Sequence, residues 1–231
     1  MGNVAFTSLQ KTEVEWHQGF NPVTKHNMKQ QFKVLTIGLT LLVLTTTTHA
    51  ELIQNGSFEN PSITVGVTLT TLPGWFVSAN VDILPNNYWR AFDGNQSLDL
   101  SGDSATGTYI QQMFPTVIGQ SYLLSFHYGN NADDAWALGR ASIFGDTTLL
   151  SQDLYHSGST SQNMNYTFFQ NEFIADASTT TLRFTHLDTP TFGRGLALDA
   201  VSVTPVPEPA PMLLLALGGA ACVVWRKRHL A

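Results

Sequence analysis

Two short segments of the chain combine aromatic rings with amide and charged side chains. The first, 85–90, reads Pro-Asn-Asn-Tyr-Trp-Arg, and the second, 129–136, places two aspartates before a tryptophan. Ligand sites pair aromatic surface with a few polar groups, and a sugar ring offers both a C–H face and hydroxyls. The predicted carbohydrate contacts are Asn87, Tyr88, Trp89, Arg90, Asp134 and Trp136. The alternative is that the two tryptophans pack over the ends of the fold.

The other polar residues form no recognisable catalytic arrangement. His127, His156 and His186 are scattered, without the spacing of a metal-ligand motif. Asp133 and Asp134 are neighbours, and adjacent carboxylates on a strand point to opposite faces, so they make a poor acid–base pair. We therefore predict that the protein is not an enzyme and requires no cofactor.

Residues 51–204, between two hydrophobic ends, are strongly acidic. They include fourteen Asp and Glu residues, four arginines and no lysine, a net charge of −10 compared with −6 for the whole chain. Such a surface repels nucleic acids and anionic lipids, so neither is predicted as a partner. Neutral sugars and divalent cations suit it. The only cysteine, Cys222, lies outside this region, so no disulfide can stabilise it.

Apolar and polar residues alternate along this region, which indicates strands rather than helices. Tyr122, Leu124, Phe126 and Tyr128, for example, would share one face of a strand. The strand-like runs are 52–58, 75–84, 97–100, 108–114, 122–128, 140–144, 149–155, 166–174, 180–187 and 196–204. Gly, Asn, Asp, Ser and Pro separate them. So many short strands predict a single all-β domain, a jelly-roll β-sandwich.

Four segments, in this order, resemble the galactose-binding-like jelly-roll domains, which include many carbohydrate-binding modules. They are Leu-Ile-Gln-Asn-Gly-Ser-Phe-Glu at 52–59, Pro-Gly-Trp at 73–75, Phe-Asp-Gly-Asn-Gln-Ser-Leu-Asp-Leu at 92–100 and Ala-Leu-Asp-Ala-Val-Ser-Val at 197–203. The resemblance implies a structural calcium ion held by Glu59 and Asp199. Calcium takes six to eight oxygen ligands, and carbonyls near Asp93 are further candidates. The alternative is that Asp199 accepts backbone hydrogen bonds while Glu59 lies in water.

The C-terminal 26 residues, 206–231, have the pattern of a sorting signal. Pro207, Glu208 and Pro209 precede an uncharged apolar stretch, 210–225, and the basic residues Arg226, Lys227 and Arg228 follow it. As a helix the stretch would measure about 24 Å, shorter than the roughly 30 Å hydrocarbon core. The basic end should stay cytoplasmic. The pattern resembles the PEP-CTERM signal, which implies processing by exosortase. An ordinary membrane anchor is the alternative.

The N-terminal hydrophobic segment has the pattern of a secretory signal peptide. In residues 28–50 a basic start precedes an apolar core, and Thr-His-Ala at 48–50 predicts cleavage after Ala50. Residues 1–27 carry acidic residues unlike a leader, so we interpret them as a disordered upstream extension; a long leader is the alternative.

Together these features predict an exported, non-catalytic protein, anchored transiently in the inner membrane and then found in the cell envelope or outside the cell. There it would bind extracellular polysaccharide. A structural or adhesive surface protein that binds other proteins is one alternative, and a polysaccharide hydrolase with an unrecognised site is another.

Overall fold

The computed structural model describes residues 50–103, 107–187 and 194–207. The predicted extension 1–27, nearly all of the signal peptide 28–50 and the tail from Glu208 onward lie outside these residues. The described part contains eleven strands. They are β1 Val67–Leu69, β2 Phe76–Val77, β3 Val81–Pro85, β4 Gln96–Asp99, β5 Tyr109–Pro115, β6 Ser121–Asn130, β7 Trp136–Phe144, β8 Thr148–Ser157, β9 Thr167–Ile174, β10 Thr179–His186 and β11 Leu196–Pro205.

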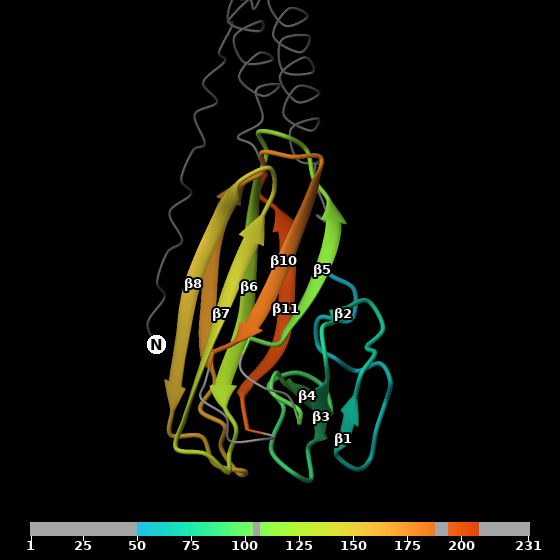
Figure 1. The fold of residues 1–231 in the computed structure, drawn as a ribbon, viewed down its shortest axis with the longest axis vertical. Coiled ribbons are helices and arrows are strands. Elements are labelled where there is room, and N and C mark those ends of the chain that lie inside the picture. The colour runs from blue at the N-terminus through green and yellow to red at the C-terminus, as the bar shows by residue number, and fades with distance from the viewer. Residues whose placement is uncertain (1–49, 104–106, 188–193, 208–231) are drawn as a thin grey trace, which may run out of the picture. The chain divides into compact units, whose positions relative to one another are not determined.

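The strands form two antiparallel sheets that pack face to face (Figure 1). One sheet has six strands in the order β1-β3-β4-β11-β6-β9, and the other has five in the order β2-β5-β10-β7-β8. This confirms the all-β sandwich. Within the described ranges, no helix is long and apolar enough to cross a membrane.

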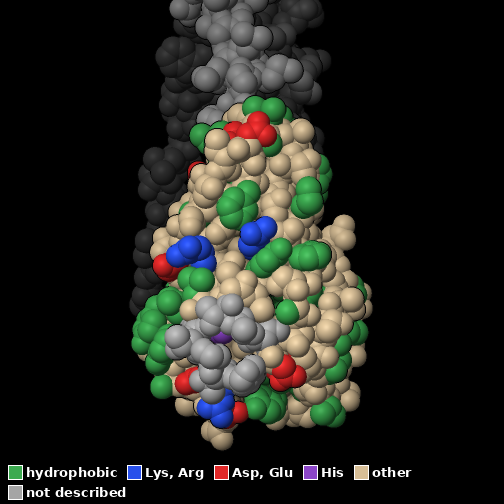
Figure 2. Space-filling view, in the orientation of Figure 1, with side chains coloured by type: hydrophobic (Ala, Val, Ile, Leu, Met, Phe, Trp, Pro, Cys, Tyr) green, Lys and Arg blue, Asp and Glu red, His purple; other side chains and the backbone are tan. Residues whose placement is uncertain are grey.

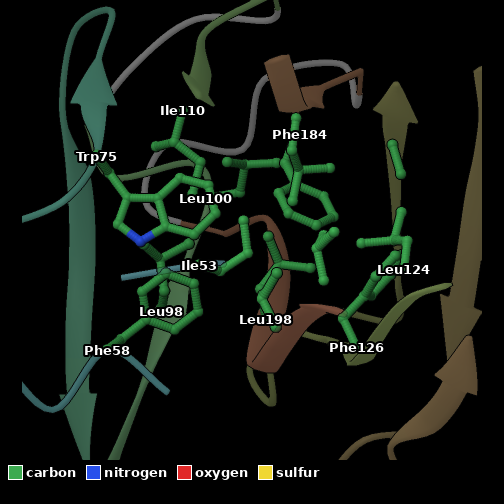
Figure 3. Close-up of a cluster of buried hydrophobic side chains, with 14 of the residues drawn as sticks. Ile53, Phe58, Trp75, Leu98, Leu100, Ile110, Leu124, Phe126, Phe184 and Leu198 are labelled. Carbon is green, nitrogen blue, oxygen red and sulfur yellow. The ribbon is translucent and has the colours of Figure 1, made fainter. Parts of the chain in front are cut away.

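The inward faces of both sheets supply one apolar core (Figure 3). Strand β6 shows the cause, because Tyr122, Leu124 and Phe126 are buried while the residues between them are partly exposed. Phe126 meets Phe184 of β10 edge to face, with ring centroids 4.9 Å apart. Among the described residues, the buried members of this core lie between residues 53 and 203. The described sandwich therefore has a core of its own, as expected of a domain that folds independently.

Two of the strand predictions are wrong in detail. Residues 52–58 form turns rather than a strand, although the Leu52 amide donates to the Val203 carbonyl at 3.0 Å. The run 75–84 divides into β2 and β3, which belong to different sheets. The alternation of apolar and polar residues could not show that the chain passes from one sheet to the other between β2 and β3, since the residues before and after this point are apolar. Strand β1 has three residues and was not predicted.

A second, smaller apolar cluster consists of Leu84, Trp89, Met164 and Ala197, with Ala132 and Tyr166 packed against it. The Trp89 indole N–H donates to the Ser97 hydroxyl of β4 at 2.7 Å. Tyr166 also contacts that hydroxyl, at 3.2 Å. Segments outside the strands thus supply side chains that cover residues of the six-stranded sheet.

Candidate functional site

The structure brings the two predicted sugar-binding segments together. The Tyr88 hydroxyl donates to a carboxylate oxygen of Asp133 at 2.6 Å, and this bond raises the pKa of Tyr88. Asn87 donates its side-chain amide to the Thr64 carbonyl at 3.2 Å. Asp134 accepts the Ala135 amide at 2.8 Å. These polar groups therefore already support the loops that carry them.

Trp89, one of the predicted sugar contacts, is buried and so presents no surface to a ligand in this structure. Its side chain is 0% exposed, and Tyr88 meets its ring edge to face at a centroid distance of 5.6 Å. The neighbouring Arg90 is exposed, and its backbone amide donates to the Ser161 carbonyl at 3.2 Å. Of the two adjacent aromatic residues, Trp89 is therefore buried and Tyr88 is exposed at the surface.

Trp136 remains at the surface, where it belongs to a sheet rather than to a loop. It opens β7, is 41% exposed, and stacks on Tyr155 of β8 with ring centroids 6.1 Å apart. Tyr155 is 60% exposed. Residues 137, 139 and 141 of β7 are buried, so Trp136 and its alternate neighbours lie on the outer side of the five-stranded sheet.

One row of residues crosses that outer side from edge to edge. The strand pairings place Phe76, Gln111, Arg183, Ser142 and Ser151 opposite one another on β2, β5, β10, β7 and β8. Phe76, at one edge, is 55% exposed. Figure 2 views this side and shows basic side chains near the middle of the sheet, with hydrophobic side chains around them. We call this surface the five-strand face.

Arg183 is held firmly at the centre of the five-strand face. Its Nε–H and Nη2 donate to the Gln111 side-chain oxygen at 3.0 and 2.7 Å. Its guanidinium lies 4.2 Å from the ring centroid of Tyr109 and 5.3 Å from that of Phe144. Such cation–π contacts fix a side chain in place without neutralising its charge.

Two more features complete the face. Arg140 of β7 forms an ion pair with Asp153 of β8 at 2.5 Å, and both side chains are exposed. At the β2 edge, a shallow hollow of about 350 Å³ is lined by residues that include Phe76, Gln111 and Met113. The face therefore offers rings at both edges, hydrogen-bonding groups between them and a recess at one side.

The sequence offered a weak signal for this face. Tyr109, Gln111 and Met113 alternate with buried residues of β5, and Arg183 alternates with buried residues of β10. That alternation indicates outward side chains. It cannot show that these strands are neighbours, because strand order depends on long-range pairing.

Glu59 and Asp199, the predicted calcium ligands, hold the same loop from two sides. Glu59 Oε1 accepts the amides of Asn95 and Gln96 at 2.8 and 3.0 Å. Asp199 Oδ2 accepts those of Phe92 and Asp93 at 2.8 and 3.0 Å. Burial raises the pKa of Asp199 to about 7, although the amides oppose the rise.

These hydrogen bonds occupy oxygens that calcium would use. Glu59 Oε1 and Asp199 Oδ2 each accept two amides, and Asp199 Oδ1 accepts the Ala200 amide at 2.7 Å. In the described ranges, no group of three or more His, Cys, Asp or Glu side chains is arranged to hold a metal ion. As they stand, the two carboxylates fit amide capping better than a calcium shell. Calcium at this pair stays a prediction.

Several solved structures are similar to the chain, all at low identity. They include a CBM4 structure (TM-score 0.44, 14% identity, 67% of this chain and 99% of that one). TmCBM61 in complex with beta-1,4-galactotriose has a TM-score of 0.49, 11% identity, and coverage of 68% and 99%. The CBM22-1 xylan-binding domain from Paenibacillus barcinonensis Xyn10C has a TM-score of 0.44 and 15% identity, and the match covers 71% of this chain and 99% of that one. At these levels they carry no information about what this chain binds.

A sequence relative is Halomucin of Haloquadratum walsbyi (strain DSM 16790 / HBSQ001). It is 28% identical over 186 residues, which are 76% of this chain. The chain spans about 2% of the length of that relative, so the match says nothing of the activity of the whole protein.

Two family models match consecutive parts of the chain. Residues 205–228 match the PEP-CTERM protein-sorting motif, which confirms that resemblance. The motif indicates an exported protein that is sorted via the membrane, and it implies processing by exosortase. Residues 51–204 match the model described as a protein of unknown function, DUF642. Because this match covers more than half of the chain, the protein belongs to the DUF642 family.

Proposed function

We propose that the five-strand face binds an extracellular polysaccharide and that the protein acts as a non-catalytic binding protein of the cell envelope. The observation that carries this proposal is the placement of exposed rings at both edges of the face, with amide, hydroxyl and guanidinium groups between them. Five strands spaced by about 4.8 Å span roughly 19 Å, room for several sugar rings. The predicted site thus moves from the loops to the sheet.

The rings suit carbohydrate because they are both exposed and fixed. Trp136 and Tyr155 brace each other by stacking, and Phe76 lies 5.9 Å from the Tyr109 ring. A sugar that packs on such rings removes apolar surface from water, while the ordered side chains lose little further entropy. Hydroxyls of the same sugar chain can then reach Gln111 and Ser151, which lie on the row that starts at Phe76 and are not buried.

The sorting motif supports an extracellular setting for this face. An exported protein meets the polysaccharides of the envelope and its surroundings. Display on the envelope, or release after exosortase processing, would place the five-strand face among them. The motif does not specify which of the two occurs, and either one leaves the face available.

Affinity gels test the proposal with a fragment of residues 50–207, which contains the whole core. The fragment should be retarded by at least one polysaccharide in a panel of neutral and acidic polymers, including the host's own exopolysaccharide. Trp136→Ala or Tyr155→Ala should weaken that binding by about tenfold, because each change removes a buried ring contact from the complex.

Phe168→Ala is the matched control. Phe168 is 53% exposed but belongs to β9 of the other sheet. It should bind like the unmodified fragment. Retardation by no polymer, or equal losses in Phe168→Ala and Trp136→Ala, would overturn the proposal. Trp89→Ala is unsuitable, since loss of a fully buried indole would impair folding.

A further inference from the structure

The two sheets differ in the sign of their charge. The strands of the five-stranded sheet carry Arg140 and Arg183 and a single acidic residue, Asp153. Those of the six-stranded sheet carry no arginine or lysine and four acidic residues. The four are Asp82, Asp99, Glu172 and Asp199. In a region with a net charge of −10, positive charge is thus concentrated on the five-strand face.

Among the residues that the structure describes, no carboxylate forms an ion pair with Arg183. Among the described residues, the arginine–carboxylate ion pair is that of Arg140 with Asp153. The bonds of Arg183 to Gln111 use its Nε–H and one Nη2–H. In the described part of the structure, its Nη1 protons have no acceptor. The guanidinium therefore keeps the Nη1–Nη2 edge for a ligand, and this edge matches the two oxygens of a carboxylate.

We propose that the five-strand face selects a glycan that carries isolated carboxylates, such as uronic acid residues spaced along an otherwise neutral chain. This inference rests on the proposed function and names its substrate class. A carboxylate on the sugar packed beside Tyr109 and Phe144 would accept two hydrogen bonds from Arg183. Neutral sugars of the same chain would pack on the rings at the edges of the face.

The charge of the whole domain limits how dense those carboxylates can be. Beyond the five-strand face, the acidic surface repels a polymer that carries a charge on every sugar. A single carboxylate near Arg183 is attracted at contact distance, while salt screens charges more than about 8 Å away at physiological ionic strength. Sparse charge is favoured for this reason, and dense polyanions such as nucleic acids are not.

Nuclear magnetic resonance of the 50–207 fragment tests the inference without knowledge of the backbone polymer. The probes are methyl β-glucuronide and methyl β-glucoside, which differ only in the group at carbon 6. The glucuronide should shift the Arg183 Nε–Hε resonance and neighbouring β5 and β10 amides. Its apparent affinity should exceed that of the glucoside by about tenfold, since hydrogen bonds to charged groups are strong.

Matched variants separate the charge from the fold. Arg183→Gln should abolish the preference for the glucuronide, so that the two probes bind with equal affinity. Arg183→Lys keeps the charge but loses the planar fork, so it should restore only part of the preference. Arg194→Gln removes the same charge as Arg183→Gln, but at an exposed position outside the strands. It should keep the preference of the unmodified fragment for the glucuronide.

The outcomes distinguish this inference from the proposed function. Equal affinity for both probes, or a preference that survives Arg183→Gln, would overturn the selection of carboxylates while polysaccharide binding stands. If a polymer retards the fragment but the glucuronide causes no shift in its resonances, the selection of carboxylates is likewise overturned while polysaccharide binding stands. Tighter binding of a fully charged polyglucuronate than of a sparsely substituted glucuronoxylan would overturn the preference for isolated carboxylates. Failure of both probes and every polymer would remove both proposals.

Discussion

Asp82 and Asp99 lie directly opposite each other on β3 and β4. Burial, aided by the negative charge of Asp99, raises the pKa of Asp82 from 3.8 to about 6. The Thr68 hydroxyl, which donates to Asp82 at 2.6 Å, opposes this rise. An acid whose pKa is raised by folding binds its proton more tightly in the folded state. Its contribution to stability is thus fully present below pH 3.8 and is lost as the pH rises through about 6.

We therefore expect Asp82→Asn to stabilise the domain more at neutral pH than in acid. The amide keeps an oxygen for Thr68 and removes the repulsion between opposed carboxylates. Free energies of unfolding of the 50–207 fragment, measured by urea titration at about pH 4.5 and about pH 7.5, check this. The difference between variant and parent should be larger at the higher pH. An equal difference at both would show that the Asp82 carboxyl does not titrate between them.

At the scale of elements, the period-two pattern predicted most strands because burial on a sheet alternates strictly. It predicted β6 and β10 well, since each has one face in the core. It failed where contacts distant in sequence decide the structure. Residues 52–58 match a strand in composition, yet they turn beside the bulge of β11.

The candidate site was harder to predict for the same reason. Trp89 and Trp136 stand in similar sequence surroundings, rich in Asn, Asp and aromatic residues. Trp89 is buried because its segment folds over β4, where Ser97 accepts its indole proton. Trp136 is exposed because it starts a strand on an outward position. The aromatic composition was informative, but the partners of each ring come from other strands, and sequence alone does not specify them.

The loop 92–96 is the element on which the calcium prediction can be decided. Gly94 has a φ of +70°, and a Cβ there would lie 2.4 Å from Glu59 Oε1, so the loop and the carboxylate fit each other closely. Glu59→Ala would leave the Asn95 and Gln96 amides without their acceptor. We expect a loss of about 1–3 kcal/mol in the free energy of unfolding.

Measurement in excess calcium and in chelator separates the two roles of Glu59. Capping of the amides predicts the same loss in both conditions. A structural calcium ion predicts that the parent melts at a higher temperature with calcium and that Glu59→Ala removes this response, because an ion bound to the folded state stabilises it by mass action. Leu69→Ala is a control for general destabilisation, since Leu69 lies on β1, the edge strand that is separated from β4 by β3.

At the scale of the whole molecule, the first and last segments of the sandwich are joined side by side. Glu51 Oε1 accepts the amides of Ile53 and Val203 at 2.8 and 2.9 Å, and its other oxygen accepts the Ser202 hydroxyl. Leu52 adds a backbone bond to Val203. Glu51 is also the residue that the predicted cleavage after Ala50 would leave at the N-terminus. Removal of the leader at that bond would preserve the junction, whereas a cut one residue later would not.

A comparison of fragments 51–207 and 52–207 tests this link between processing and stability. The shorter fragment loses every hydrogen bond of the Glu51 carboxylate, so we expect its free energy of unfolding to fall by about 1–2 kcal/mol. Glu51→Gln in the longer fragment should cause a smaller loss, because the amide keeps one acceptor oxygen. Equal stability of 51–207 and 52–207 would mean that solvent replaces these bonds without cost. The junction would then place no constraint on where the leader is cut.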